Sequence, residues 1–226
     1  MNPRSVRLLK IPVFIACLLP LAKLSLEAFG LAGLSLGANP IEELIHRCGL
    51  WGLNFLYITL TVTPLRRISG WNWLIRFRRM FGLFAFFYLC LHFTSYAGLD
   101  QRFDFIAIGE DILKRPYITL GITGLTLLIP LAITSFDIWK KRLGKNWKRL
   151  HQLVYFIAPL VVLHYVWSKK GDILSLQGEV LKPLIYGLIV AIFLMLRIPA
   201  IKKALASFPG RKLSLRKKQE PQPEHA

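Results

Sequence analysis

The sequence has few acidic residues, few cysteines and none of the short motifs that bind nucleotides or catalytic zinc. Only 12 Asp and Glu accompany 30 Lys and Arg, and the three cysteines include no Cys-x-x-Cys pair. We therefore expect neither a disulfide framework nor an iron–sulfur site. The motifs GxGxxG, GxxxxGK[ST] and HExxH are all absent. The chain thus lacks a recognisable dinucleotide-binding domain of the kind that soluble reductases use.

Long hydrophobic runs are abundant instead. Hydrophobic residues make up 54% of the chain, and the mean hydropathy is +0.46. In lipid the backbone polar groups must be satisfied internally, and a helix of roughly 20 apolar residues spans the bilayer. The sequence therefore predicts an all-α, polytopic membrane protein, a bundle of six transmembrane helices. The predicted spans are 11–30, 44–63, 80–97, 117–135, 150–167 and 181–199.

The charged residues predict the orientation of this bundle. Lys and Arg gather in alternate connecting segments and most Asp and Glu in the others, so the positive-inside rule places both termini in the cytoplasm. We divide the chain into a cytoplasmic N-terminus at 1–10, a transmembrane domain at 11–199 and a basic, flexible cytoplasmic tail at 200–226. The first span is expected to be retained, because no small-residue cleavage site is evident. The outer loop 98–116 mixes apolar and polar residues and could lie on the membrane surface.

Four of the five histidines lie in or beside the apolar runs, where ionisable side chains are costly and usually functional. Histidine is also a standard axial ligand of haem iron. Depth decides which histidines can meet. His92 and His164 both fall in the outer halves of their spans, so a haem can be clamped between the third and fifth helices. The middles of spans two to six contain no carboxylate, which favours electron transfer over a proton relay.

His151 stands at the inner end of the fifth span, 13 residues before His164 and roughly 20 Å away along a helix. The two cannot ligate one iron, but they can serve two haems stacked across the bilayer. Pro159 can kink the helix between them. At the matching depth of the third span stand Arg78 and Arg79, which cannot ligate iron but can pair with haem propionates. The second axial ligand of an inner haem stays open.

The sequence allows two roles for each of two further residues. His46, at an outer boundary, either makes a structural hydrogen bond or has a functional role. Tyr96 lies one helical turn after the histidine of the third span, and either bonds a propionate or anchors the membrane interface. Asp137 is expected to pair with Lys140 or Lys141. No internal repeat is evident in the sequence.

Four segments carry a resemblance to a known family. They are TPLRR (63–67), RRMFGLFAFFYLCLHFTSY (78–96), RPYITLG (115–121) and LGKNWKRLHQLVYFIAPLVVLHYVW (143–167). Together they resemble the MsrQ family, formerly YedZ, of the ferric-reductase-like transmembrane group, over about residues 40–200. The members of this family are haem-binding membrane subunits of a bacterial periplasmic methionine sulfoxide reductase system.

The resemblance implies a function and a set of ligands. Such a protein lies in the bacterial inner membrane and passes electrons from the quinone pool through haem b to a periplasmic molybdopterin reductase, MsrP, which repairs oxidised methionine in envelope proteins. FMN is expected as a further cofactor. The family's haem histidines fall on His92, His151 and His164. Relatives with two bis-histidine haems carry another histidine where Arg78 or Arg79 stands here, so one or two haems are expected.

Two other classes of protein remain as alternatives. A stand-alone ferric or superoxide-forming reductase would favour a cytoplasmic flavin and NAD(P)H domain, for which the tail after residue 200 is too short. A non-redox membrane scaffold or transporter would use its histidines only for hydrogen bonds. We expect an electron-transfer subunit of an oxidoreductase rather than its catalytic subunit.

Overall fold

Helices form all the regular structure of the described chain. The computed structural model describes residues 2–168 and 181–196. Within these ranges the elements are α-helices with short 3-10 and π segments, and no strand occurs. The all-α prediction is therefore confirmed for this part. The predicted tail at 200–226 and the last residues of the predicted span 181–199 lie outside the described residues.

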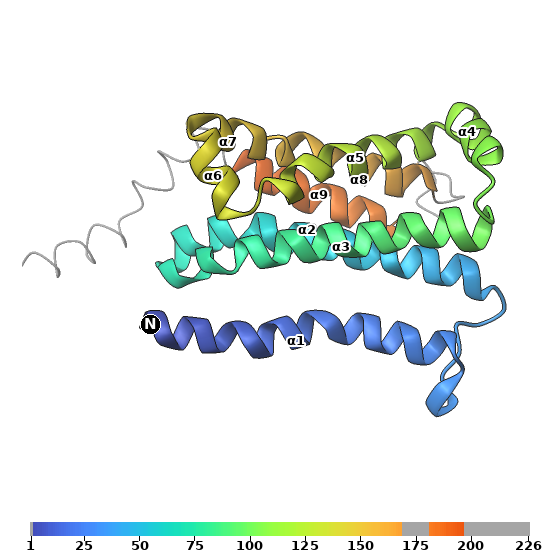
Figure 1. The fold of residues 1–226 in the computed structure, drawn as a ribbon, viewed down its shortest axis with the longest axis horizontal. Helices are drawn as coiled ribbons and strands as arrows, with labels where there is room; N and C mark the ends of the chain where they lie inside the picture. Colours follow the sequence, from blue (N-terminus) through green and yellow to red (C-terminus); the bar gives the residue numbers. More distant parts are fainter. Residues whose placement is uncertain (1, 169–180, 197–226) are drawn as a thin grey trace, which may run out of the picture.

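Six apolar helices run back and forth along the long axis of the molecule (Figure 1). They are α1 Pro3–Ala28, α2 Pro40–Ser69, α3 Arg78–Ser95, α5 Pro116–Ile133, α8 Val154–Ser168 and α9 Leu181–Met195. In the described ranges five segments are long and apolar enough to cross a membrane. α9 has 15 residues, fewer than the about 20 that a span requires. The sixth span therefore stays a prediction.

α2 is longer than the hydrophobic run 44–63 that predicted it. Asn39 caps the helix, because its side chain accepts a hydrogen bond from an amide of the first turn. The helix continues past Pro64 and ends at Gly70, which takes a left-handed conformation with φ of 74°. The segment 64–79, expected as a connecting loop, thus begins as helix, and TPLRR belongs to α2.

The fifth predicted span is interrupted. α7 Lys145–His151 ends at its histidine, and α8 begins after a turn formed by Gln152 and Leu153. Pro159 lies inside α8, and the helix continues through it. The break that separates His151 from His164 is therefore this turn and not the proline, so the two histidines belong to different helices.

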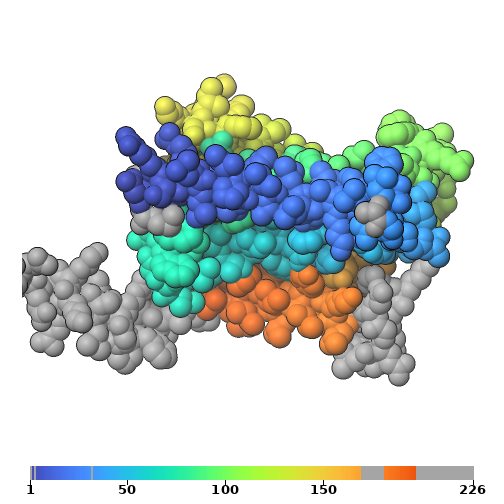
Figure 2. All heavy atoms as spheres, turned by 90° about the horizontal axis from the view of Figure 1, so that it is seen from below, coloured from blue at the N-terminus to red at the C-terminus, as the bar shows by residue number. Residues whose placement is uncertain are grey.

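The core lies where α2, α3, α5 and α8 meet, with α1 as a layer on its outside (Figures 1 and 2). Tyr88 of α3 and Ile157 and Ala158 of α8 are 0% exposed. The Tyr88 hydroxyl also reaches α1, where it donates to the Cys17 carbonyl at 2.9 Å and accepts from the Leu21 amide at 3.0 Å. This pair of hydrogen bonds ties the outer layer to the core.

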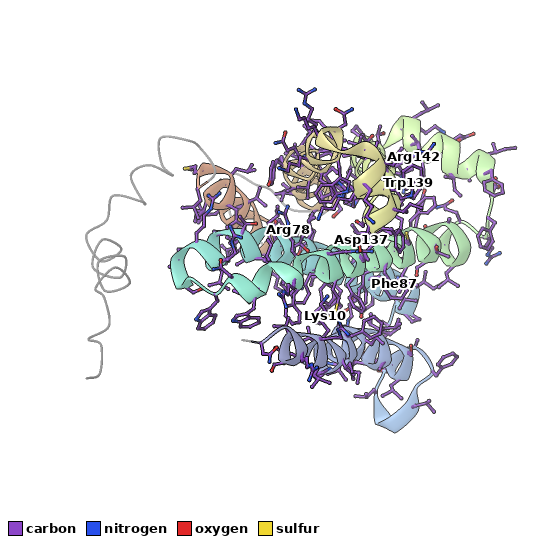
Figure 3. The ribbon with its side chains drawn as sticks, turned by 60° about the vertical axis from the view of Figure 1, so that its left-hand side comes forward. Lys10, Arg78, Phe87, Asp137, Trp139 and Arg142 are labelled. Carbon is purple, nitrogen blue, oxygen red and sulfur yellow. The ribbon has the colours of Figure 1, made fainter. Side chains whose placement is uncertain are left out.

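The two ends of the bundle differ in charge. We call the end at which α1 begins the basic end; Figure 3 brings it forward and labels three of its cations. They are Lys10, Arg78 and Arg142. The opposite, acidic end carries the starts of α2 and α5 and most carboxylates of the described chain. Those carboxylates are Glu42, Glu43, Asp100, Asp104, Glu110 and Asp111. This separation of charge is the pattern on which the predicted orientation rests.

The loop 98–116 contains a short helix at the acidic end. α4 Phe105–Lys114 begins at Asp104, whose carboxylate accepts hydrogen bonds from two amides of the first turn. Two positive-φ residues, Arg102 and Phe103, turn the chain into it. The helix lies beyond the start of α5, at one edge of the bundle (Figure 1).

Candidate functional site

His92 of α3 and His164 of α8 face each other near the acidic end of the bundle. Their ring centroids lie 6.0 Å apart, and the ring planes meet at 76°. Both side chains are half-buried. The structure thus brings together the two histidines that depth in the sequence predicted as a pair.

Each histidine is held by a backbone carbonyl of a neighbouring helix. The Nδ1 of His92 lies 2.8 Å from the carbonyl oxygen of Ile45 on α2. The Nδ1 of His164 lies 2.6 Å from the carbonyl oxygen of Tyr117 on α5. A carbonyl oxygen only accepts, so each Nδ1 carries the proton and donates it. The Nε2 atoms are then free of protons, the arrangement in which a metal-ligating histidine is fixed by a second hydrogen bond.

A glycine lies against each ring, one helical turn after the carbonyl that holds it. A Cβ at Gly49 would lie 3.0 Å from Nδ1 of His92, and a Cβ at Gly121 would lie 2.9 Å from Nδ1 of His164. Real Cβ atoms essentially never approach as closely as the one at Gly121 would, and the contact at Gly49 is tighter than nine in ten real ones. A side chain at Gly121 would therefore displace the His164 ring, and one at Gly49 would require the His92 ring to move by a few tenths of an ångström.

The two arrangements repeat along the chain. In both, 47 residues separate the histidine from its carbonyl partner. We call the carbonyl and glycine of each arrangement a cradle: Ile45 with Gly49 for the first histidine, and Tyr117 with Gly121 for the second. An offset of 72 residues relates one cradle to the other. This similarity is structural; in the sequence it is visible only as the pattern Gly-x-x-Gly, at 49–52 and 121–124.

The distance between the paired rings fits a shared haem iron. Two metal–nitrogen bonds of about 2 Å, with about 1.1 Å from each nitrogen to its ring centre, add up to about 6 Å. The 6.0 Å between the His92 and His164 centroids agrees with this value. In the described part of the chain, no three His, Cys, Asp or Glu residues are placed to hold a bare metal ion. A porphyrin supplies the remaining ligands itself, so two axial histidines suffice.

His151 forms a separate site near the basic end. Its ring stacks on Trp147 with centroids 4.1 Å apart, and its Nδ1 lies 3.1 Å from the Trp147 carbonyl oxygen. Its Nε2 is buried without a hydrogen-bond partner in the described chain. A buried nitrogen left in this way is costly unless another group binds it. His151 therefore has the features of a metal ligand, and the group that its Nε2 would bind must come from outside the chain.

The two neighbouring arginines differ in their partners. Arg79 pairs with Asp137 at 3.3 Å and lies over the Phe136 ring, so the expected pairing of Asp137 with Lys140 or Lys141 was wrong. Arg78 is half-buried, and its guanidinium donates a 3.5 Å hydrogen bond to the Thr63 hydroxyl. It also lies within electrostatic range of the His151 site. Of these two arginines, only Arg79 therefore has a carboxylate partner among the described residues.

Tyr96 and His46 complete the acidic end of the site. The Tyr96 hydroxyl donates to the Asp111 carboxylate at 2.9 Å, which ties α4 to the end of α3. His46 follows the carbonyl residue of the first cradle, and it lies close enough to both paired rings to interact with them electrostatically. No partner for His46 could be predicted from the sequence, and the structure places it near the pair.

Known proteins match most of this chain. The family described as “Ferric reductase like transmembrane component” matches residues 48–162. A protein of Herminiimonas arsenicoxydans is 51% identical over 198 residues, 87% of this chain and 87% of its own. A protein of Azospira oryzae is 48% identical over 198 residues, 87% of this chain and 81% of its own. One of Rhodospirillum rubrum is 49% identical over 199 residues, 87% of this chain and 91% of its own.

All three relatives carry the name “Protein-methionine-sulfoxide reductase heme-binding subunit MsrQ”. The matched ferric-reductase-like region includes both cradle glycines and the first two of the three predicted haem histidines, and it ends two residues before His164. About half of all positions are identical over nearly the whole chain. On this evidence the chain belongs to the MsrQ family of ferric-reductase-like transmembrane proteins.

Proposed function

We propose that this chain is the haem-binding membrane subunit of a methionine sulfoxide reductase. It passes electrons from membrane quinol through haem b to a periplasmic molybdopterin reductase of the MsrP type, which repairs oxidised envelope proteins. The name of the relatives supports the haem and the reductase. Family resemblance alone supports quinol as donor, MsrP as acceptor and FMN as a further cofactor. The chain is then a carrier of electrons and not the catalytic subunit.

The pairing of His92 with His164 carries this proposal. The two ring centroids lie 6.0 Å apart, and each Nδ1 is held by a backbone carbonyl, which leaves each Nε2 available as a metal ligand. A histidine that only stabilised helix packing would not need an identical cradle on a second pair of helices. We therefore assign one bis-histidine haem to these two residues.

A second haem would lie at the basic end. There His151 offers a buried Nε2, and Arg78 offers a cation without a carboxylate partner in the described chain. Arg79 is already paired with Asp137 and contributes less. A haem bound here would have one protein ligand among the described residues, so its second axial position is open to water or another ligand.

The proposed topology follows from charge and length. With the basic end in the cytoplasm, six spans place both termini there and the histidine pair near the periplasm. α9 then serves as the sixth span of a transmembrane domain at 11–199, and 200–226 forms the cytoplasmic tail. The host membrane is the bacterial inner membrane, because the proposed acceptor is periplasmic.

The residues of the site have separable tasks. Bound haem supplies the one-electron relay between a two-electron donor and its acceptor. The cradles fix the tautomer and the ring positions of the two ligands. The apolar core around α3 and α8 keeps water from the rings, and Arg78 balances the negative charge of a propionate. Tyr96 holds α4, which borders the site, against α3.

Visible and EPR spectra of the purified protein test the assignment. The wild-type protein is expected to show a Soret band and the low-spin EPR signal of a bis-histidine haem. A quinol analogue should reduce this haem under anaerobic conditions. His92→Ala and His164→Ala should each remove the same low-spin signal. His151→Ala should leave that signal in place, which makes it the matched histidine control outside the pair.

Two results would contradict the proposal. If the wild-type protein has no Soret band, the chain is a non-redox scaffold or transporter. If His92→Ala and His164→Ala alter two different haem signals, the pairing across α3 and α8 is incorrect.

A further inference from the structure

A cleft opens between α1, α2 and α3 toward the acidic end of the bundle. Its volume is about 200 Å³. Mostly apolar side chains line it, including Leu24, Ser25, Leu44, Cys48, Leu91 and Ser95. Its α1 wall belongs to the outermost span: 17% of the apolar stretch of α1 is buried, against 50% for α2. The cleft is therefore accessible from the lipid beside α1.

The size of the cleft limits what can occupy it. An apolar cavity of about 150 Å³ holds one benzene molecule. A cleft of about 200 Å³ holds one six-membered ring with small substituents. Haem and flavin need more space, because sites for ligands of that size measure roughly 300–1,000 Å³. The occupant is thus a single-ring molecule that partitions into the membrane, with room for a tail only on the lipid side.

The cleft and the histidine pair share a wall. Cys48, which lines the cleft, precedes Gly49, against which the His92 ring packs. Leu91, on the facing helix, precedes His92 itself. A ring in the cleft would therefore lie one side-chain layer from the proposed iron ligand.

Few polar groups line the cleft, and one of them has no hydrogen-bond partner among the described residues. The Ser25 hydroxyl already donates to the Leu21 carbonyl at 2.9 Å. The Ser95 hydroxyl lines the cleft and has no hydrogen-bond partner among the described residues. A short distance along the same helices, Glu27 is 7% exposed and pairs with Arg47 at 2.6 Å. The site thus suits an apolar ring that carries one or two hydroxyl or carbonyl oxygens.

We propose that this cleft binds the ring of the membrane quinol, with the Ser95 hydroxyl bonding a ring oxygen and the isoprenoid tail lying in the lipid beside α1. The assignment rests on the proposed function, which makes a quinol the electron donor. It adds the location of that donor: beside the haem held by His92 and His164, at the acidic end, and not beside His151.

A photoreactive short-chain azidobenzoquinone tests the site in the full-length, haem-loaded protein. Labelled peptides are mapped by mass spectrometry, with decylubiquinone or a phospholipid without a ring as competitor. Ser25→Phe should fill the cleft and abolish the labelling of α1 and α3. Leu26→Phe, the neighbouring position of α1, which does not line the cleft, is the matched control. Ser95→Ala should weaken binding about 5-fold, the usual effect of one lost hydrogen bond.

The outcomes separate the cleft from the proposed function. Labelling of α1 and α3 that decylubiquinone displaces and Ser25→Phe removes supports the site. Quinone-specific labelling elsewhere, unchanged by Ser25→Phe, overturns the site but leaves quinol as donor. Labelling that phospholipid displaces equally well identifies a lipid chain as occupant and overturns the site. If decylubiquinone displaces the label from no peptide, both the proposed site and the assignment of quinol as electron donor are wrong.

Discussion

One added methyl group at Gly121 tests whether its cradle positions His164. An ideal Cβ there would lie 2.9 Å from both Cε1 and Nδ1 of the ring, whereas ordinary contacts begin at 3.4 Å. The ring must therefore retreat by about 0.5 Å in Gly121→Ala. Metal–ligand distances in working sites hold to within about 0.2 Å. The retreat exceeds what an iron–nitrogen bond accepts, so the haem should lose this ligand or bind it weakly.

The same substitution should change the stability of the protein much less. Overpacking costs about 1–3 kcal/mol of the free energy of unfolding. Replacing a helical glycine by alanine returns about 1 kcal/mol, because alanine favours the helix. The net loss is about 2 kcal/mol or less. Loss of haem with a nearly unchanged fold is therefore the expected signature.

The assay measures the haem-to-protein ratio by pyridine haemochrome, the low-spin EPR signal, and the thermal unfolding of the membrane-extracted protein. Gly82→Ala is the matched control, because its Cβ would lie 3.6 Å from Thr59, an ordinary contact. Gly82→Ala should keep both haem and signal. If Gly121→Ala also retains the wild-type ratio and signal, the cradle does not position His164, and the argument from close approach fails.

Two further substitutions probe the flanks of the site. Arg78→Ala should lower the content or the reduction potential of a haem at His151, because a cation without a carboxylate partner is lost. Arg79→Ala is the control, and both variants are measured by potentiometry. Equal effects of the two substitutions would contradict the assignment of Arg78. Tyr96→Phe removes the 2.9 Å hydrogen bond to Asp111 and should cost about 1–1.5 kcal/mol locally. Hydrogen exchange should then speed up in α4 and not in α8; unchanged exchange in α4 would show that this bond does not hold the helix.

The depth of the histidines could be predicted from the sequence because span boundaries and charge fix it. His92 and His164 each lie a similar distance along the sequence from an acidic connecting segment, and a helix satisfies its own backbone hydrogen bonds in lipid. The cradles could not be predicted in this way. They depend on the rotation of α2 and α5 about their axes, and a run of apolar residues on all sides of a helix leaves that rotation undefined.

The predicted helix boundaries differ from the observed ones for a related reason. Hydropathy marks where apolar residues stop, but α2 continues through TPLRR because the last turns of a helix can project from the membrane. The turn at Gln152 and Leu153 interrupts an otherwise continuous apolar pattern. No glycine or proline at these positions predicts the turn. The pairing of Arg79 with Asp137 depends on how the short helix α6, Asp137–Leu143, lies relative to α3, which local sequence does not determine.

Each paired histidine is secured by a helix other than its own: α2 braces the ligand of α3, and α5 braces the ligand of α8. In the proposed site, four helices from both halves of the chain must therefore be docked before both histidines are in position to ligate a haem iron. If the proposed haem site is correct, stable haem binding would follow the docking of both halves of the chain and would come late in assembly.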